Sequence, residues 1–261
     1  MTGAPAMAAA RGPAEPRAPA DVIVLVRGAG DLATGVAWRL KRAGFGVIMC
    51  ELEHPLTVRR SVAFSTAVGE GSVNVEGIRA VRATTVEAAA LAHSDAVPVV
   101  VSPGLPPLPA DVIVDARVAK RELDTAIGDA ALVVALGPGS EAGRDCHAVI
   151  ETMRGPRLGR VYWQGRAAPN TGTPAVIGGR GAERVRAPFA GVVRGLIADG
   201  TPVAQGLKIG DIDPRADTHW REISDKALAV AGGVLEAILT WLSPRTGGRA
   251  RSGSRPPGRD R

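Results

Sequence analysis

An uninterrupted apolar run near the start of the chain is followed at once by a glycine-rich segment. Residues 22–26 read Val-Ile-Val-Leu-Val, and residues 28–33 read Gly-Ala-Gly-Asp-Leu-Ala. A run without polar alternation is typical of a strand buried on both faces of a parallel sheet. Apolar residues then recur at helical spacing up to Gly44, at Leu32, Val36 and Leu40. The pattern predicts a strand, a glycine turn and a helix in direct succession.

Apolar strands and helical segments go on alternating to about residue 150. The pattern predicts a short helix over residues 55–68 and an Ala-rich helix over 84–92. Strands, or a hairpin in the second case, are predicted over residues 46–50, 73–81, 97–101, 112–115 and 132–136. This alternation indicates an α/β domain with a Rossmann-like doubly wound sheet over residues 21–150.

The following part of the chain, residues 151–242, has a different pattern. Short apolar segments are separated by an Ala-Pro-x-x-Gly turn at residues 187–191 and an Asp-Gly-x-x-Val-x-x-Gly turn at 199–206. They resemble half of a biotinyl or lipoyl barrel-sandwich, but no lysine stands in a Met-Lys-Met-like hairpin, which argues against a swinging-arm carrier. We therefore expect a small β (partial barrel-sandwich-like) module followed by a C-terminal helix that begins at Ser224.

The net charge of +6 is carried by the two ends of the chain. Residues 243–261 contain six arginines and one aspartate, and residues 1–20 contain two arginines and one glutamate. We expect both ends to be disordered tails around a formally neutral body. Aromatic residues make up only 3% of the chain, so neither a basic folded surface nor stacking side chains indicate specific nucleic-acid binding.

The sequence also predicts a cytoplasmic location without membrane contact. The first twenty residues lack the apolar stretch of a secretory signal, and no run approaches the roughly 20 apolar residues of a membrane span. Cys50 and Cys146 have no metal-type spacing, and no cluster supplies the three or four ligands that a metal needs. A sulfur-carrying role for Cys146 would require a cationic neighbour, for which His147 is the adjacent candidate.

The glycine turn is the strongest candidate for ligand binding. Gly-x-Gly-x-x-Ala between a strand and a helix is a dinucleotide-type pattern, in which free N–H groups and the helix dipole attract a phosphate. The residues concerned are Gly28, Ala29, Gly30, Asp31 and Leu32. Glu51 ends the second strand 21 residues after Gly30, near the position that commonly holds a ribose hydroxyl, and it favours NAD(H) over the phosphorylated form.

Two alternatives to this interpretation stay open. Asp31 would cap the helix and repel a phosphate, unless Arg27 offset its charge. The glycines would equally form a tight turn that binds no ligand.

A second candidate set consists of cations at later strand and helix ends. Guanidinium and ammonium groups suit an anionic ligand such as a pterin phosphate or a pyrophosphate. The residues are Arg59, Arg60, Arg117 and Lys120, with Asp115 at a strand end to orient a base or a ribose. The alternatives are solvated helix faces, ion pairs with Glu51, Glu53 or Asp115, and a helix-capping role for Asp115.

Several segments, in order over residues 22–240, resemble the YqeB family. They are residues 27–35 (RGAGDLATG), 51–60, 114–120, 136–139 (LGPG), 149–155, 169–172 (PNTG), 208–215 (KIGDIDPR) and 223–237 (ISDKALAVAGGVLEA). The resemblance implies an accessory or maturation protein of a selenium-dependent molybdenum hydroxylase system. It further implies a molybdopterin-type cofactor, and a molybdenum hydroxylase or its maturation proteins as partners.

The chain departs from the family pattern at two places. The join between Gly179 and Arg186 is short, as if half of the barrel-sandwich were missing, and the unpaired sheet edges would be satisfied by a homodimer. Trp220 stands where the family carries a cysteine shortly before the Ile-Ser-Asp-Lys string.

Three functions are consistent with these observations. The first is an accessory protein that binds a nucleotide or pterin-type cofactor in the Rossmann-like crevice. The second is an NAD-dependent oxidoreductase, although no serine–tyrosine–lysine or histidine–aspartate relay stands out. The third is a non-catalytic nucleotide-binding module.

Overall fold

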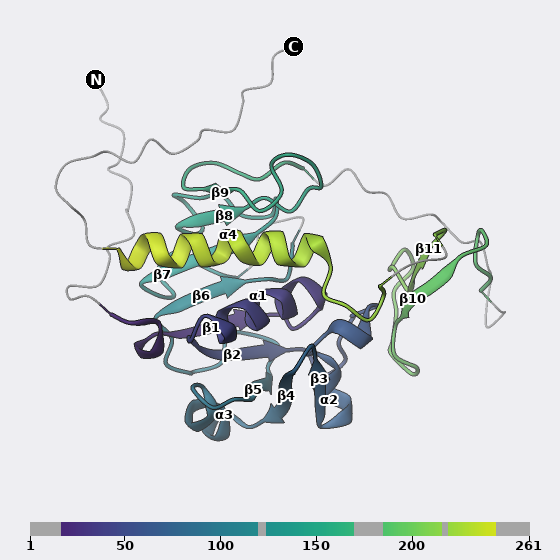
Figure 1. Ribbon diagram of the computed structural model, residues 1–261, viewed down its shortest axis with the longest axis horizontal. Helices are drawn as coiled ribbons and strands as arrows, with labels where there is room; N and C mark the ends of the chain where they lie inside the picture. Colours follow the sequence, from purple (N-terminus) through teal and green to yellow (C-terminus); the bar gives the residue numbers. More distant parts are fainter. Residues whose placement is uncertain (1–16, 120–123, 170–184, 216–218, 244–261) are drawn as a thin grey trace, which may run out of the picture.

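The computed structural model describes residues 17–119, 124–169, 185–215 and 219–243 (Figure 1). The main sheet contains β1 (Ile23–Arg27), β2 (Gly46–Glu51), β3 (Ser72–Val75), β4 (Ile78–Ala83), β5 (Val97–Val101), β6 (Val112–Asp115), β7 (Leu132–Leu136), β8 (Ala148–Ile150) and β9 (Val161–Tyr162). A second sheet contains β10 (Val192–Leu196) and β11 (Gly210–Asp213). The helices are η1 (Pro19–Asp21), α1 (Asp31–Arg42), η2 (Arg60–Val62), α2 (Thr66–Glu70), α3 (Thr85–Leu91) and α4 (Asp225–Leu242).

The nine strands of the main sheet have the order β3-β4-β5-β2-β1-β6-β7-β8-β9. The strands from β4 to β8 are parallel, and only the edge strands β3 and β9 are antiparallel to their neighbours. From β1 the chain first builds the β2 side of the sheet and then returns to place β6 on the other side of β1. The reversal makes the β1–β6 border a topological switch point, where such sheets bind ligands. The predicted Rossmann-like doubly wound fold is confirmed.

The apolar residues of the central strands alternate between two buried layers. Val24 and Val26 of β1 pack into one hydrophobic cluster with residues of α1 and α4, whereas Leu25 belongs to the cluster on the opposite face. The layer of α1 and α4 covers the sheet in Figure 1, where the two helices lie side by side. The continuous apolar run of the sequence therefore follows from burial on both faces.

The C-terminal helix takes part in the main core. Helix α4 packs along α1 and over β7, β8 and β9, so it lies on the large sheet and not within the small β module with which the sequence pattern grouped it. No helix occurs in the described residues between β6 and β8, so α4 covers the face that crossover helices would otherwise cover. Gly233 of α4 lies against the carbonyl oxygen of Gly159.

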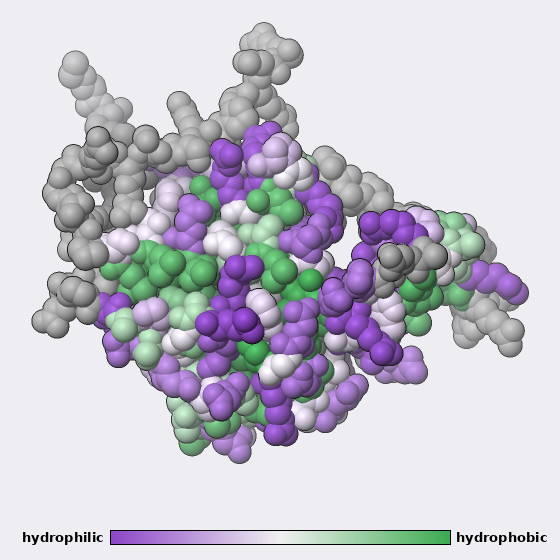
Figure 2. Space-filling view, viewed as in Figure 1, coloured by the Kyte–Doolittle hydropathy of each residue, from purple (hydrophilic) through white to green (hydrophobic). Residues whose placement is uncertain are grey.

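The small sheet stands beside the carboxyl ends of the large sheet (Figure 1). Gly195 of β10 lies so close to the carbonyl oxygen of Val58 that a side chain would not fit, and Arg60 Nε donates to the Leu196 carbonyl oxygen at 3.0 Å. Hydrophilic side chains gather between this sheet and the body of the protein (Figure 2). Pairing of its edges with a second subunit stays a prediction.

Two sequence-based expectations differ from the structure in detail. The single helix predicted over residues 55–68 is wrong: the segment contains only η2 and the start of α2. The Phe64 N–H donates to the Thr34 hydroxyl at 2.8 Å, so a tertiary contact replaces a helical hydrogen bond. Within the predicted N-terminal tail, Arg17 pairs with Asp111 at 2.6 Å. Among the described helices, none has the length and apolar character needed to cross a membrane.

Candidate functional site

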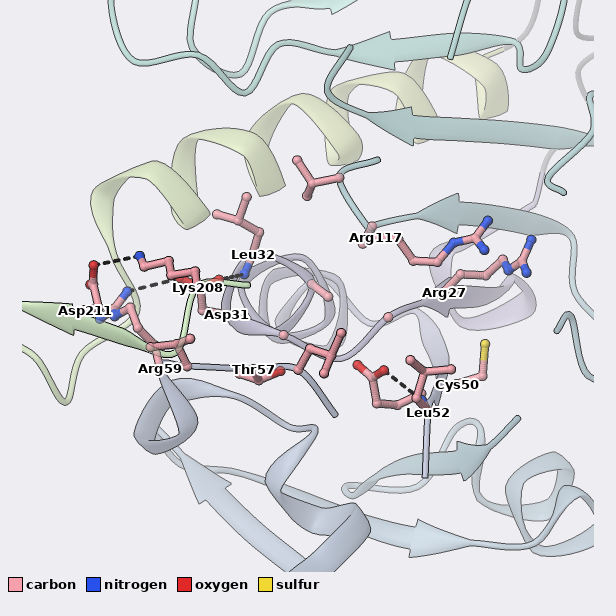
Figure 3. A pocket seen from close by; sticks show the side chains of 18 of the residues that line it. Arg27, Asp31, Leu32, Cys50, Leu52, Thr57, Arg59, Arg117, Lys208 and Asp211 are labelled. Carbon is pink, nitrogen blue, oxygen red and sulfur yellow. Dashed lines mark hydrogen bonds and ion pairs between the residues drawn. The ribbon is translucent and has the colours of Figure 1, made fainter. Parts of the chain in front are cut away.

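A cleft of about 740 Å³ opens at the carboxyl ends of β1, β2, β5 and β6 (Figure 3). Its floor is the glycine turn after β1, and its walls include Ser102–Gly104 after β5 and residues 116–118 after β6. The small sheet contributes Arg194 and Asp211, and the first turn of α4 contributes Lys226. The cleft therefore lies at the switch point and joins both sheets.

The glycine turn has the conformation that the sequence predicts. Gly28 has φ of +91°, which only glycine adopts without strain, and its N–H donates to the Cys50 carbonyl oxygen at 2.8 Å. The Ala29 N–H donates to Glu51 Oε2 at 2.7 Å, and the Leu52 N–H donates to Glu51 Oε1 at 2.7 Å. Glu51 is thus fixed at the edge of the cleft, and each carboxylate oxygen keeps a lone pair for a ligand hydroxyl.

Asp31 is the first residue of α1 and faces the same cleft. Its Oδ1 accepts from the N–H of its neighbour Leu32 at 2.9 Å. The N-cap residue of α1 is Gly30 and no side chain caps this helix, so the expectation that Asp31 is the cap is wrong. Arg59 Nη1 lies 3.4 Å from Asp31 Oδ2, whereas Arg27 bonds elsewhere. The cation that offsets the Asp31 charge is therefore Arg59, and the expectation for Arg27 is wrong.

Arg27 and Arg117 form a charge network under one end of the cleft. The Arg27 side chain is 2% exposed and donates to Asp124 at 2.8 Å and to the Thr125 hydroxyl at 2.6 Å. Arg117 donates to Asp115 at 2.6 Å and to Asp124 at 2.8 Å. The two guanidiniums thus share an aspartate, and Figure 3 shows them together, away from α1.

The carboxylates of this network are held in their charged form. Burial alone would raise the Asp115 pKa, but hydrogen bonds from Arg117 and Thr125 outweigh it and hold the pKa below its ordinary value. Hydrogen bonds from Arg27 and Arg117 likewise lower the pKa of Asp124. Asp115 is therefore a buried ion-pair partner in this structure, and it is neither a helix cap nor a free carboxylate.

The other predicted cations have different positions. Arg59 lines the cleft and donates to the carbonyl oxygens of Trp220 and Glu222 at 3.4 and 3.1 Å, so it also ties the segment before α4 to the body. Arg60 points to Leu196 and is not among the residues that line the cleft. Lys120 lies outside the described residues, as do the Asn and Thr of the Pro-Asn-Thr-Gly segment at residues 169–172.

The two thiols are buried and hard to ionise. Burial raises the pKa of Cys50 to about 11 and that of Cys146 to about 12. His147 Nδ1 accepts from the Val133 N–H at 2.9 Å, and burial lowers the pKa of His147. This histidine is therefore not the cationic neighbour that a sulfur-carrying Cys146 requires. Within the described ranges, no three His, Cys, Asp or Glu side chains are grouped as a metal site needs.

Comparison with curated proteins gives one relative of high similarity. The chain is 44% identical over 258 residues to the Escherichia coli (strain K12) protein named "Uncharacterized protein YqeB", across 84% of this chain and 48% of the relative. The chain belongs to the YqeB family. It spans about half the length of that relative. No family model matches the chain, and no solved structure matches it.

Sequence reasoning missed four cations that line the cleft of this YqeB-family chain: Arg154, Arg194, Lys208 and Lys226. Lys208 and Lys226 stand in the Lys-Ile-Gly-Asp and Ser-Asp-Lys strings that carry the family resemblance, so the motifs themselves held a signal. Their approach to the glycine turn depends on tertiary packing of the small sheet and of α4. In all, seven cationic and three acidic described side chains line the cleft.

Proposed function

We propose that this chain is an accessory protein that binds a phosphate-bearing nucleotide or pterin-type ligand in the cleft at the switch point. The observation that carries the proposal is the excess of cations, seven against three carboxylates, around a glycine turn and the start of a helix. The volume of about 740 Å³ is in the range of small-molecule sites. A phosphate ester of drug-like size is the ligand class that this charge and volume favour.

Glu51 supports a nucleotide among the phosphate esters. Two backbone N–H groups orient its carboxylate beside the glycine turn, and the free lone pairs suit the two hydroxyls of a ribose. A 2′-phosphate at this place would meet a carboxylate. The same observation favours, as a second candidate, an NAD-dependent oxidoreductase; a non-catalytic nucleotide-binding module would use the same contacts.

The biological setting in this proposal rests on the YqeB resemblance. It suggests that the chain serves a selenium-dependent molybdenum hydroxylase system, with a molybdenum hydroxylase or its maturation proteins as partners and a molybdopterin-type cofactor as one possible ligand. Cytoplasmic location and a homodimer belong to the same proposal. The matched relative is about twice as long as the matched segment. The activity and partners of a full-length family protein are therefore also part of the proposal.

Isothermal titration calorimetry of the pure chain with NAD⁺, NADH, CTP and molybdopterin nucleotides tests the proposal. We expect micromolar or tighter binding of at least one of them. The Arg154→Ala variant, which removes a cation from the cleft, should bind it more weakly, whereas Arg79→Ala on the exposed part of β4 should not change the affinity. Binding of none of these ligands would overturn the proposal. Turnover of NADH with a substrate would favour the oxidoreductase.

A further inference from the structure

The cations of the cleft differ in whether a carboxylate accompanies them. Six of the seven lie within 2.5–3.4 Å of a carboxylate: the pairs are Arg27–Asp124, Arg117–Asp115, Arg59–Asp31, Arg154–Asp225, Arg194–Asp211 and Lys208–Asp211. Lys226 has no hydrogen-bond or ion-pair partner for its ammonium group in the described part of the chain. Among the cations that line the cleft, Lys226 is therefore the one whose ammonium group no carboxylate of the described residues contacts.

Lys226 stands where two helices begin. It is the second residue of α4, one residue after the helix start, and the Ser224 Oγ before it accepts from the Ala227 N–H at 3.1 Å. Gly35, in the second turn of α1, packs against Ala227 so closely that an added Cβ would lie 2.8 Å from the Ala227 Cβ. Figure 1 shows α1 and α4 starting at the same end, toward the small sheet. The positive ends of both helix dipoles thus lie beside Lys226.

Two side-chain atoms of cleft-lining residues, Arg59 Nε and Arg194 Nε, are buried without a hydrogen-bond partner among the described residues. Arg59 is nine-tenths buried and lines the cleft, and its Nε has no hydrogen-bond partner among the described residues. Buried polar atoms are nearly always satisfied, so Arg59 Nε is a donor for which a molecule bound in the cleft would supply an acceptor. Arg59 lies 3.4 Å from Asp31 at the start of α1, and the charge of Asp31 also acts on Lys226.

The surroundings of Lys226 disfavour an isolated ammonium group. Burial lowers the Lys226 pKa, and the nearby positive charge of Arg154 lowers it further. The charges of Asp31, Glu151 and Asp225 act in the opposite direction without outweighing these two effects. An anion in contact with Lys226 would stabilise the charged form of its ammonium group.

We propose that Lys226 is the main ionic contact for a phosphate or diphosphate group of the ligand, held between the first turns of α1 and α4 with Arg59 beside it. The inference rests on the proposed function in that it places the phosphate of the same ligand. It differs from the sequence-based hypothesis, which put the phosphate on the glycine turn and the cations Arg59, Arg60, Arg117 and Lys120.

The test uses inorganic pyrophosphate as the probe, titrated into the full chain by calorimetry at constant ionic strength. We expect wild type to bind it, Lys226→Gln to bind it about tenfold or more weakly, and Lys226→Arg to keep most of the affinity. Lys208→Gln is the comparison within the cleft, since Lys208 lines the same cleft but is paired with Asp211 at 2.7 Å. Its loss of affinity should be several-fold smaller than that of Lys226→Gln. Arg79→Gln, at an exposed position outside the cleft, is the control and should bind as wild type does.

Amine acylation read by mass spectrometry tests the wild-type chain, in case Lys226→Gln does not fold. Pyrophosphate should protect Lys226 from acylation and leave Lys208 reactive. Equal losses in Lys226→Gln and Lys208→Gln, or no protection of Lys226, would overturn the inference. If pyrophosphate binds through Lys226 while no nucleotide or pterin binds, the anion site stands and the proposed function fails. If nucleotides bind and Lys226→Gln leaves their affinity unchanged, the proposed function stands and the inference about Lys226 fails.

Discussion

Gly233 of α4 lies directly against the carbonyl oxygen of Gly159, and a Cβ atom on residue 233 would overlap that oxygen. The adjacent Gly232 has no atom within 4 Å of its corresponding position. Replacement of these two adjacent glycines by alanine should therefore change the stability of the protein in opposite directions. Gly233 permits contact between α4 and the loop before β9, whereas Gly232 only weakens the helix.

Gly233→Ala should destabilise the protein by roughly 1–3 kcal/mol, because the helix must move away from Gly159. Gly232→Ala should stabilise it by up to about 1 kcal/mol, since alanine favours the helix. Urea unfolding followed by circular dichroism measures both changes. Equal effects of the two substitutions would show that the helix is not packed as described.

The small sheet should affect ligand binding more than stability. Gly195 of β10 lies against Val58, so Gly195→Ala would push the sheet, with Arg194, away from the rest of the cleft. We expect at least a fivefold loss of affinity for a bound ligand with a change in melting temperature of only a few degrees. Val193→Ala, at a half-exposed position of the same strand, is the control and should bind normally. Unchanged affinity in Gly195→Ala would remove the sheet from the site.

Glu51→Gln tests the contact between β2 and the glycine turn. An amide NH₂ group would face the Ala29 N–H or the Leu52 N–H in place of an acceptor oxygen, which leaves a donor unsatisfied. The expected cost is about 1–3 kcal/mol of stability, measured by urea unfolding. If a ribonucleotide is the ligand, its affinity should fall while that of pyrophosphate is retained. Equal affinity of wild type for NAD⁺ and NADP⁺ would contradict the role assigned to Glu51.

Acid should destabilise the protein through Asp115. Its pKa in the folded chain is below the ordinary value of about 3.9, so between the two values the unfolded chain binds more protons. The contribution of Asp115 to the free energy of unfolding should therefore be constant above that range and fall as pH decreases through the folded pKa. Asp115→Asn should cost roughly 3 kcal/mol at pH 7 because it breaks a buried pair, and its stability should decline less steeply below pH 4. If the stability of Asp115→Asn declined with pH as steeply as that of wild type, other carboxylates would dominate the loss of stability in acid.

Neither cysteine should react in the folded protein. Cys50 is 3% exposed and Cys146 is 1% exposed, and burial raises both pKa values to about 11 and about 12. Ellman's reagent at pH 8 should modify fewer than one thiol per chain in an hour, and two after addition of urea. Rapid reaction of a native thiol would revive the sulfur-carrying hypothesis for Cys146.

Local patterns in the sequence were sufficient for the first β-α-β unit. The run before Gly28, the helical spacing after Asp31 and the distance to Glu51 each depend on neighbouring residues, and all three features occur as predicted. The hairpin of β3 and β4 also follows from its alternation. Backbone geometry of a few adjacent residues determines such elements, so they can be read without knowledge of the remaining chain.

Contacts between distant segments could not be predicted in this way. Asp124 and Thr125 belong to a loop without periodicity, yet they bind Arg27 from 97 and 98 residues away. The apolar face of α4 was visible in the sequence, but nothing in it states which sheet that face covers. Lys226 was therefore not placed at the cleft, although the motif around it was noted.

The position of α4 has a consequence for the order in which the protein matures on the ribosome. Strands β7 to β9 are made before the helix that shields one of their faces, so this face is open to water until residue 242 has left the exit tunnel. Because Lys226 belongs to that helix, the cleft lacks this cation until the helix has been made. A nascent chain that pauses before α4 is made would expose the apolar face of β7 to β9, and its cleft would lack Lys226.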